Sequence, residues 1–409
     1  MRHWKTAYKS VWNVNVKEKN MTVRSKVQRS IWFVTLALVL VLSSCAPSAR
    51  QLSSAEPTPS SPIVLSDQGY FFVGGSYVSS GDQDRAMTGQ IYVHYQVPEN
   101  VTHPYPVIMI HGGGQTGTNF MGTPDGREGW ADFFLREGYA VYVIDQPGRG
   151  KSAFNKETYG ELSSPSTVLG LEQRFTAPEK FKLWPQASLH TQWPGTGMAG
   201  DPVFDEFFAS QVPSITSGDL MERLNRRAGA ALLDKIGPSI LLTHSQSGPF
   251  GWQIADARPK LVKGILAVEP SGGPFYNSPV LGGDLARPWG ITSTALKYEP
   301  AVSNPSDIKR VQKAQADAPG LVRCWSQAKP ARKLVNLQNI PIFIFVSEAS
   351  YHAQYDHCTS KYLTQAGVAN DFIRLEDIGI RGNGHMIMLE RNNTVTAKLM
   401  TDWLSDHVE

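Results

Sequence analysis

The sequence predicts an α/β fold with a mostly parallel central sheet, helices on both faces and inserted cap segments. Short runs of apolar residues recur along the chain, and stretches with helical periodicity separate them. Continuous apolar runs are typical of strands buried on both faces, and strand–helix alternation is typical of parallel sheets. The 409 residues, 41% of them hydrophobic, are enough for one large domain with a full core.

The strands follow from the apolar pattern. The segment 91–97 alternates apolar and polar side chains, as a half-buried strand does. Later runs are almost wholly apolar and should form the buried centre of the sheet. The predicted strands are Tyr70–Val73, Ile91–Val97, Val107–Ile110, Ala140–Ile144, Ser239–Leu242, Ile265–Val268 and Ile342–Val346.

Helices are predicted between and after these strands. Apolar residues keep a 3.6-residue period over Asp219–Ile236, and Gly237 with the following proline ends the pattern. Further helices are predicted at Gly248–Asp256 and Val395–Leu404. The segments 153–215, rich in aromatic residues, and 271–337, rich in proline and glycine, interrupt the alternation. Long insertions of this kind form either plain loop packing or a cap over a binding site, and we expect cap segments.

The first 44 residues have the features of an export signal. Basic residues precede the apolar run Ile31–Leu42, which is 12 residues long. A membrane-spanning helix needs roughly 20 residues, so a cleaved signal is the better interpretation. Met21 is an alternative start, because residues 1–20 make the basic region unusually long.

The signal ends in Leu42-Ser43-Ser44-Cys45, which resembles the signal of bacterial lipoproteins. This resemblance implies that Cys45 is lipidated and tethers the exported protein to the membrane of a bacterial cell envelope, with the outer membrane favoured over the inner one because Ala46 follows. Residues 45–62 are rich in serine and proline and should form an extended tether. The folded domain is therefore expected at 63–409.

Charge, cysteine content and histidine spacing indicate which kinds of binding site the chain can have. Without residues 1–44 the chain has 31 basic and 35 acidic residues, a formal charge of −4, and no basic patch suggests nucleic-acid binding. Cys324 and Cys358 then remain, either as a disulfide or as two separate buried thiols. His352 and His357 lie near Cys358 without convincing ligand spacing, so we expect no metal and no cofactor.

The stretch THSQSG, residues 243–248, is similar to the G-x-S-x-G turn of serine hydrolases. Ser245 follows a predicted strand and precedes a predicted helix, which is the setting of an exposed nucleophile. Thr243 and Ser247 replace the usual glycines, and both are small enough for the turn. The alternative is a buried structural serine.

The stretch IHGGGQTG, residues 110–117, follows a buried strand and could supply backbone N–H groups to an oxyanion. His111 and Gly112 begin this loop. We assign the two donors to Gly113, with Gly114 as the second choice, and to Gln246, the residue after the predicted nucleophile.

A general base and its acid partner complete the predicted site. His385 lies in a loop rich in glycine and asparagine near the end of the chain, where a returning base belongs. The candidate acids are Glu269, after the strand Ile265–Val268, and Glu348 or Asp356, after the strand Ile342–Val346.

Several motifs together resemble α/β-hydrolases of the secreted bacterial carboxylesterase type, in which the acid is a glutamate after the sixth strand. They are IHGGG (110–114), YVIDQPGRGKS (142–152), HSQSG (244–248), VEP (268–270) and GNGHMIMLERNN (382–393). GRGKS ends like a phosphate-binding loop, but Asp145 stands where that loop needs its first glycine, so it is better read as the turn after a strand.

The resemblance implies a serine carboxylesterase that takes small-molecule esters, with Ser245 as nucleophile, His385 as base and Glu269 as acid. Two other interpretations stay open. One is a lipase, polyester hydrolase or amidase with the same triad. The other is a non-catalytic lipoprotein that binds a ligand with a hydrolase fold.

Overall fold

The computed structural model describes residues 61–79, 81 and 84–408. The predicted signal at 1–44, the alternative start Met21, Cys45 and most of the predicted tether at 45–62 lie outside the described residues. Within the described part, no helix has both the length and the apolar character needed to cross a membrane.

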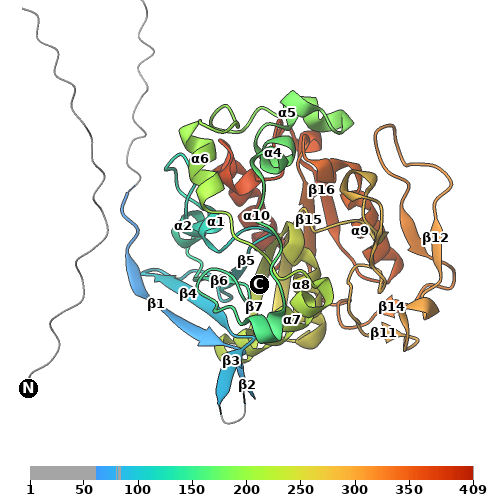
Figure 1. Ribbon diagram of the computed structural model, residues 1–409, viewed down its shortest axis with the longest axis horizontal. Helices are drawn as coiled ribbons and strands as arrows, with labels where there is room; N and C mark the ends of the chain where they lie inside the picture. The colour runs from blue at the N-terminus through green and yellow to red at the C-terminus, as the bar shows by residue number, and fades with distance from the viewer. Residues whose placement is uncertain (1–60, 80, 82–83, 409) are drawn as a thin grey trace, which may run out of the picture. The chain divides into compact units, whose positions relative to one another are not determined.

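The centre of the fold is an eight-stranded sheet with the order β1-β4-β6-β5-β7-β8-β15-β16 (Figure 1). β1 and β4 pair antiparallel, β4 pairs antiparallel with β6, and every later pair in the sheet is parallel. The strands are β1 (Leu65–Val73), β4 (Ile91–Pro98), β6 (Val141–Asp145), β5 (Val107–Ile110), β7 (Ser239–His244), β8 (Val262–Val268), β15 (Ile342–Val346) and β16 (Asp371–Arg374). The predicted α/β fold with a mostly parallel sheet is confirmed.

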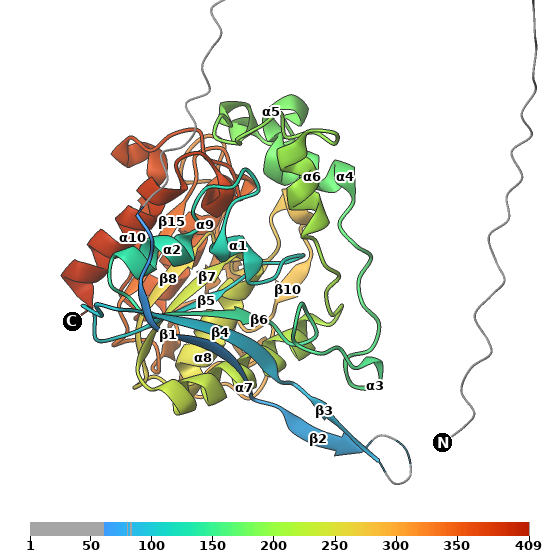
Figure 2. The ribbon, with the colours of Figure 1, turned by 90° about the vertical axis from the view of Figure 1, so that its left-hand side faces the viewer.

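Helices cover both faces of the sheet because successive side chains of the buried strands point to opposite sides. In β5, Val107 and Met109 belong to one core cluster, and Ile108 and Ile110 belong to the other. The first cluster packs against α2 and α10, and the second against α7, α8 and α9. Figure 2 shows α2 and α10 on one side of the sheet and α7 and α8 on the other. These helices are α2 (Trp130–Arg136), α7 (Gly218–Ile236), α8 (Gly248–Ala257), α9 (Asp356–Gln365) and α10 (Asn393–His407).

The predicted strands are present, and an edge strand and a hairpin outside the central parallel strands were missed. β5 and β15 have the predicted bounds, β6 lies one residue later than predicted, and β7 and β8 extend by two and three residues at one end. The edge strand β16 was missed because its four residues, DFIR, are half-exposed and include two charged side chains. The hairpin of β2 (Ser76–Ser79) and β3 (Arg85–Thr88) was missed because its strands are short and largely solvent-facing.

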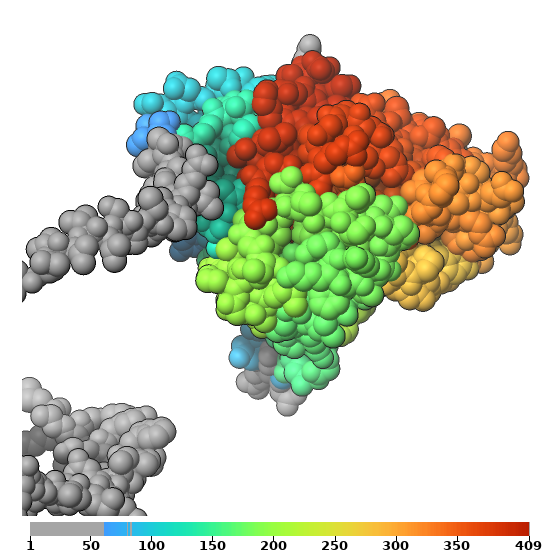
Figure 3. Space-filling model, turned by 90° about the horizontal axis from the view of Figure 1, so that it is seen from above, coloured from blue at the N-terminus to red at the C-terminus, as the bar shows by residue number. Residues whose placement is uncertain are grey.

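The segment 153–215 forms a series of short helices over one end of the sheet, with α4, α5 and α6 at the top of Figures 1 and 2. From above, the green surface of this segment lies against the red C-terminal part of the chain (Figure 3). The helices are α3 (Lys156–Tyr159), α4 (Val168–Leu171), η1 (Glu172–Thr176), α5 (Pro178–Phe181), η2 (Pro185–Leu189) and α6 (Pro202–Ala209).

The segment 271–337 forms short two-stranded pairs, with two single helical turns between them. The pairs are β9 (Phe275–Tyr276) with β10 (Leu285–Arg287), β11 (Tyr298–Glu299) with β14 (Lys333–Leu334), and β12 (Arg310–Gln312) with β13 (Trp325–Gln327). Cys324 and Cys358 form a disulfide, with sulfur atoms 2.02 Å apart, that joins this segment to α9. Of the two alternatives for these cysteines, the structure has the disulfide.

The remaining helices are single turns in the connections. They are α1 (Thr118–Met121), η3 (Ser245–Ser247), η4 (Pro279–Leu281), η5 (Pro305–Asp307), η6 (Tyr351–Gln354), η7 (Leu375–Ile378) and η8 (Ile387–Leu389). Two of them matter for the site, because η3 begins with Ser245 and η6 begins with Tyr351.

Candidate active site

Ser245 lies at the sharp turn between β7 and α8, at the carboxyl end of the sheet. Its φ is 54°, a left-handed conformation that non-glycine residues rarely adopt. Such strain persists only where the surrounding structure enforces it, and it is the backbone geometry that exposes a nucleophilic serine at an elbow.

Ser247, at the position of the second usual glycine, uses its hydroxyl group to hold the elbow together. The Oγ atom donates to the carbonyl oxygen of Ile110 at 2.7 Å and accepts from the N–H of His244 at 2.8 Å. These bonds tie the turn to the end of β5, where the glycine-rich loop begins. A serine at this position therefore stabilises the turn.

Thr243, at the position of the first usual glycine, has room for its side chain because α8 has a glycine opposite it. A Cβ at Gly251 of α8 would lie 2.9 Å from the Thr243 Cγ2 atom. A Cβ at Gly248 would lie 2.6 Å from the Cβ of Pro270, after β8. The close approach of α8 to its neighbours therefore depends on Gly248 and Gly251.

Ser245, His385 and Glu269 form a continuous hydrogen-bonded chain. The Nε2 atom of His385 lies 3.0 Å from the Ser245 Oγ atom, and its Nδ1 atom lies 2.6 Å from the Glu269 Oε2 atom. His385 is 1% exposed and Glu269 is fully buried. The order nucleophile, base and carboxylate is that of a serine-hydrolase triad.

Glu269 directly follows β8, the sixth strand in the sheet order, and two further donors fix its carboxylate. Oε1 accepts from the N–H of Ser347 at 2.8 Å, and Oε2 accepts from the hydroxyl of Ser350 at 2.7 Å. Burial raises the pKa of Glu269, and these bonds act in the opposite direction. Burial also holds the pKa of His385 well below its usual value, so the resting imidazole is neutral and can accept a proton.

The two other candidate acids are engaged elsewhere. Glu348 accepts from Arg381 at 2.6 Å and from the N–H of Gly382 at 2.8 Å, and so braces the loop before His385. Asp356 lies 3.0 Å from the Nδ1 atom of His352. The structure brings Glu269, and neither of these two residues, to His385.

The glycine-rich loop packs against the elbow. A Cβ at Gly112 would lie 3.2 Å from the Cβ of Ser245, so only glycine fits there without displacement. Gly113 and Gln246 line the pocket that contains Ser245. Gly114 is outside that lining, and its carbonyl oxygen accepts from the N–H of Val212 at 2.8 Å. This arrangement favours Gly113 over Gly114 as an oxyanion donor.

Arg149 braces this loop, and the sequence did not single it out. Its guanidinium donates to the Gly112 carbonyl oxygen at 2.9 Å and to the Gln246 Oε1 atom at 2.7 Å. His111 has a structural role, because its Nε2 atom accepts from the N–H of Gln146 and its Nδ1 atom donates to Gly112. Arg149 belongs to the stretch GRGKS, where the sequence indicated only a turn.

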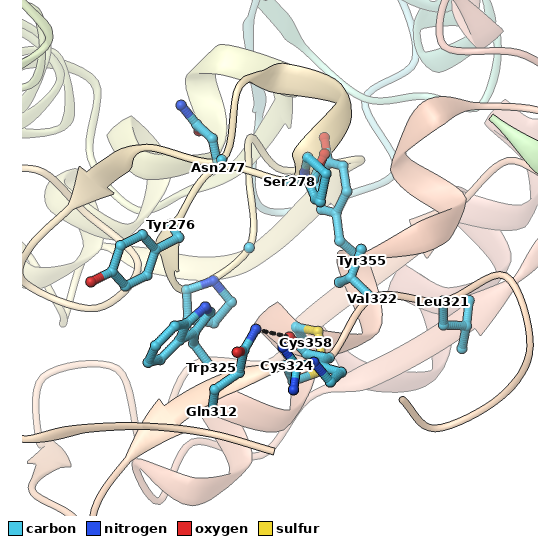
Figure 4. Close-up of a pocket in the computed structure, with 15 residues that line it drawn as sticks. Tyr276, Asn277, Ser278, Gln312, Leu321, Val322, Cys324, Trp325, Tyr355 and Cys358 are labelled. Carbon is cyan, nitrogen blue, oxygen red and sulfur yellow. Dashed lines mark hydrogen bonds between the residues drawn. A yellow bond between two sulfur atoms is a disulfide. The ribbon is translucent and has the colours of Figure 1, made fainter. Parts of the chain in front are cut away.

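The pocket at Ser245 has a volume of about 320 Å³. Cap residues of 153–215 contribute one wall, with Leu171 and Phe175 as its apolar part. No residue of 271–337 lines this pocket among the described residues. Segment 271–337 instead borders a separate pocket, beside Tyr276, Trp325 and the disulfide (Figure 4).

Two groups of side chains in the described residues bring metal-binding atoms close together. In the first, His357 lies beside Cys324 and Cys358, whose sulfurs are bonded to each other. In the second, His352 joins His385 and Glu269, which are already hydrogen-bonded. Neither group offers a set of free ligands.

An ion pair fixes the loop of His385 to the cap. The Nε2 atom of His190 lies 2.7 Å from the Oε1 atom of Glu390, which also accepts from the N–H of Gly384. The Nδ1 atom of His190 lies 3.1 Å from Glu179. Burial lowers the pKa of His190, but hydrogen bonds and charges from the two glutamates outweigh it and raise the pKa to about 9.

This ion pair predicts a loss of stability in alkaline solution. Since the folded pKa is above the unfolded value near 6.5, the contribution is fully present below pH 6.5 and is lost as pH rises through about 9. We expect the free energy of unfolding to fall by up to about 3 kcal/mol over this range. Urea denaturation at several pH values measures the slope. The His190→Gln variant should show a flatter dependence of the free energy of unfolding on pH. The control variant His407→Gln, at the end of α10, should keep the wild-type slope. An unchanged slope in His190→Gln would contradict the assignment of the pH dependence to His190.

The known proteins that resemble this chain are described as hydrolases, which agrees with the geometry of the site. The model of the alpha/beta hydrolase family matches residues 107–399. The chain is 47% identical over 337 residues to a probable secreted lipase, phiG, of Fungal sp. (strain ATCC 74256), covering 82% of this chain and 88% of that protein. It is 25% identical to a solved structure described as a novel bacterial esterase, with a TM-score of 0.59, covering 87% of this chain and all of that one.

Proposed function

Because the chain belongs to the alpha/beta hydrolase family, we propose that it is a serine carboxylesterase with Ser245 as nucleophile. The observation that carries this proposal is the hydrogen-bonded chain from Ser245 through His385 to Glu269, at a strained elbow that borders a pocket. Its relatives include a named lipase and a named esterase, which agrees with ester hydrolysis.

The proposed reaction proceeds through an acyl-serine intermediate. The Ser245 Oγ atom attacks the ester carbonyl carbon while His385 takes the hydroxyl proton on Nε2. Glu269 accepts the hydrogen bond from Nδ1 and stabilises the imidazolium. The N–H groups of Gly113 and Gln246 bind the negative oxygen of the tetrahedral intermediate.

The intermediate then collapses and the alcohol leaves with the proton from His385. Water next attacks the acyl-serine carbonyl, and His385 takes a proton from it as a general base. The acid is released and Ser245 regains its proton. Both halves use the same three side chains, and neither needs a cofactor.

The size of the pocket favours short acyl groups. Its volume of about 320 Å³ is near the lower end for ligand pockets. A lipase is the second candidate, because a relative carries that name. A polyester hydrolase or an amidase with the same triad remains a further alternative, and a non-catalytic ligand-binding lipoprotein is disfavoured by the intact triad geometry.

Acyl-chain profiling separates the carboxylesterase from the lipase. We expect kcat/KM for p-nitrophenyl acetate and butyrate to exceed that for the palmitate ester by about tenfold or more, because an acyl chain that does not fit the pocket displaces the ester carbonyl from Ser245. The measurement uses purified protein with the acetate, butyrate, octanoate and palmitate esters. A value that rises up to palmitate would favour the lipase, and cleavage of p-nitroanilides at similar rates would favour the amidase.

We also propose that the protein is exported and anchored by a lipid on Cys45. The signal-like segment 1–44 and the word "secreted" in the name of the fungal relative support export. The anchor, and its place in the outer membrane of a bacterium, rest on the sequence around Cys45 alone. Release of the Cys45→Ser variant from the membrane fraction tests the anchor, and its unchanged retention there would contradict it.

A further inference from the structure

Arg174 is the charged side chain of the pocket at Ser245. It lies in η1, in the middle of the cap segment, and borders the pocket next to Phe175. No aspartate or glutamate lines this pocket in the described part of the chain. The pocket therefore has a positive charge with no acidic side chain in its walls.

The side chain of Arg174 makes no ion pair and no hydrogen bond with another described residue. Its Nε atom is buried and has no acceptor. A guanidinium that borders a pocket and has no acceptor from the protein is a candidate for binding an acceptor of the ligand. Nearby Glu172 does not serve this purpose, because its Oε1 atom accepts from the N–H of Ala199.

The local backbone is also unusual. Residues 172–176 form a single π-helical turn, and such turns are frequent at functional sites. Burial raises the pKa of Tyr351, and the positive charge of Arg174 is one of the influences that act against this shift. The Tyr351 Oη atom in turn lies 3.3 Å from the His385 Nε2 atom.

Two hydroxyl groups of the pocket wall can add donors to the guanidinium. Ser166 and Thr167 belong to the cap segment, as Arg174 does, and both line the pocket. Hydroxyl and guanidinium donors together are the groups that bind carboxylate or phosphate oxygens.

We propose that Arg174 binds an anionic group of the substrate, so that the natural substrate is an ester that also carries a carboxylate or a phosphate. This proposal rests on the esterase function proposed above and names its substrate class. The guanidinium forms charge-assisted hydrogen bonds to the anionic oxygens while Ser245 attacks the ester carbonyl. The anion thereby positions the ester.

The test compares each anionic ester with a neutral ester of similar size, using the full chain. Monoethyl glutarate is paired with ethyl pentanoate, and the acetate ester of glycerol phosphate is paired with that of glycerol. We expect kcat/KM to favour the anionic member in at least one pair by about tenfold or more, since hydrogen bonds to charged groups are the stronger ones. The pair that shows the preference distinguishes carboxylate from phosphate.

Variants assign the preference to this residue. Arg174→Gln should lower the ratio of anionic to neutral kcat/KM by about tenfold or more, and Arg174→Lys should restore part of it. Lys180→Gln, which removes the same charge from α5 of the cap outside the pocket, is the matched control and should leave the ratio unchanged. In the wild type, sodium chloride should weaken competitive inhibition by glutarate, because salt screens charge attraction.

A wild-type protein with no preference for either anionic ester would overturn the proposal, as would an Arg174→Gln variant that loses both members of a pair equally. The glutarate measurement needs no variant, so it applies even if Arg174→Gln does not fold. A wild type that hydrolyses no ester, or a Ser245→Ala variant that remains active, would instead overturn the esterase function itself.

Discussion

Ser245→Ala should lower kcat for p-nitrophenyl acetate by a factor on the order of 10⁵, because the acyl-serine pathway then has no nucleophile. The remaining rate would come from the oxyanion donors and from substrate binding alone. The variant should keep its fold, since the Ser245 hydroxyl makes its contacts with His385 and Tyr351 and supports no strand or helix. Initial rates at saturating substrate, with melting temperatures for both proteins, provide the measurement.

Ser326→Ala, on β13 and outside the pocket, is the matched control for this experiment and should retain the wild-type rate. Full activity in Ser245→Ala would contradict the proposed mechanism. In that case the strained turn would be a structural feature only, and the pocket would have to serve binding.

Glu269→Gln should lower kcat by about 10⁴, an effect known for loss of the triad carboxylate. Glutamine has one oxygen where the carboxylate has two, so it cannot accept from Ser347, Ser350 and His385 together in the same geometry. The imidazole then loses the group that fixes its tautomer and stabilises its positive charge. Rates of the variant across pH 5–9 measure the loss.

The comparison with Glu348→Gln makes this test specific. Both residues are glutamates at the ends of neighbouring strands, but Glu348 pairs with Arg381 and does not contact His385. We expect Glu348→Gln to lose less than about tenfold, since it weakens one brace of the His385 loop. A larger loss in Glu348→Gln than in Glu269→Gln would contradict the assignment of Glu269 as the acid.

The sequence predicts the centre of this fold well, because buried parallel strands leave a strong local signal. β5 and β15 are wholly apolar and were predicted with correct bounds. The edge strand β16 is held by its pairing with β15, and its own residues carry no such pattern. Local patterns therefore predict what is buried on both faces, and they miss what is stabilised by pairing alone.

The sequence predicts the site residues that directly follow strands, but it does not predict those whose side-chain positions depend on tertiary packing. Ser245 and Glu269 come directly after β7 and β8, so the topology alone brings them to one edge of the sheet. The choice of Glu269 over Glu348 needed the family resemblance, and the structure shows the contacts that distinguish them. Arg149 and Arg174 lie in a turn and in the cap, where no periodic signal indicates the direction of a side chain.

Thr243 and Ser247, which replace the usual glycines of the elbow, also show that the sequence alone does not predict tertiary packing. The stretch THSQSG departs from the expected pattern at two positions, and sequence reasoning shows only that both residues are small. In the structure, Ser247 binds the end of β5, and Gly251 leaves room for Thr243. Compensation by a residue eight positions later is a tertiary effect.

The most direct measurement of the central claim is labelling with a fluorophosphonate, followed by peptide mapping by mass spectrometry. We expect one phosphonyl group per protein on the Ser245 oxygen, with loss of esterase activity in proportion to labelling, because the triad activates that hydroxyl. Glu269→Gln should label much more slowly than Glu348→Gln. Absence of label from Ser245 in protein that still hydrolyses esters would contradict the account.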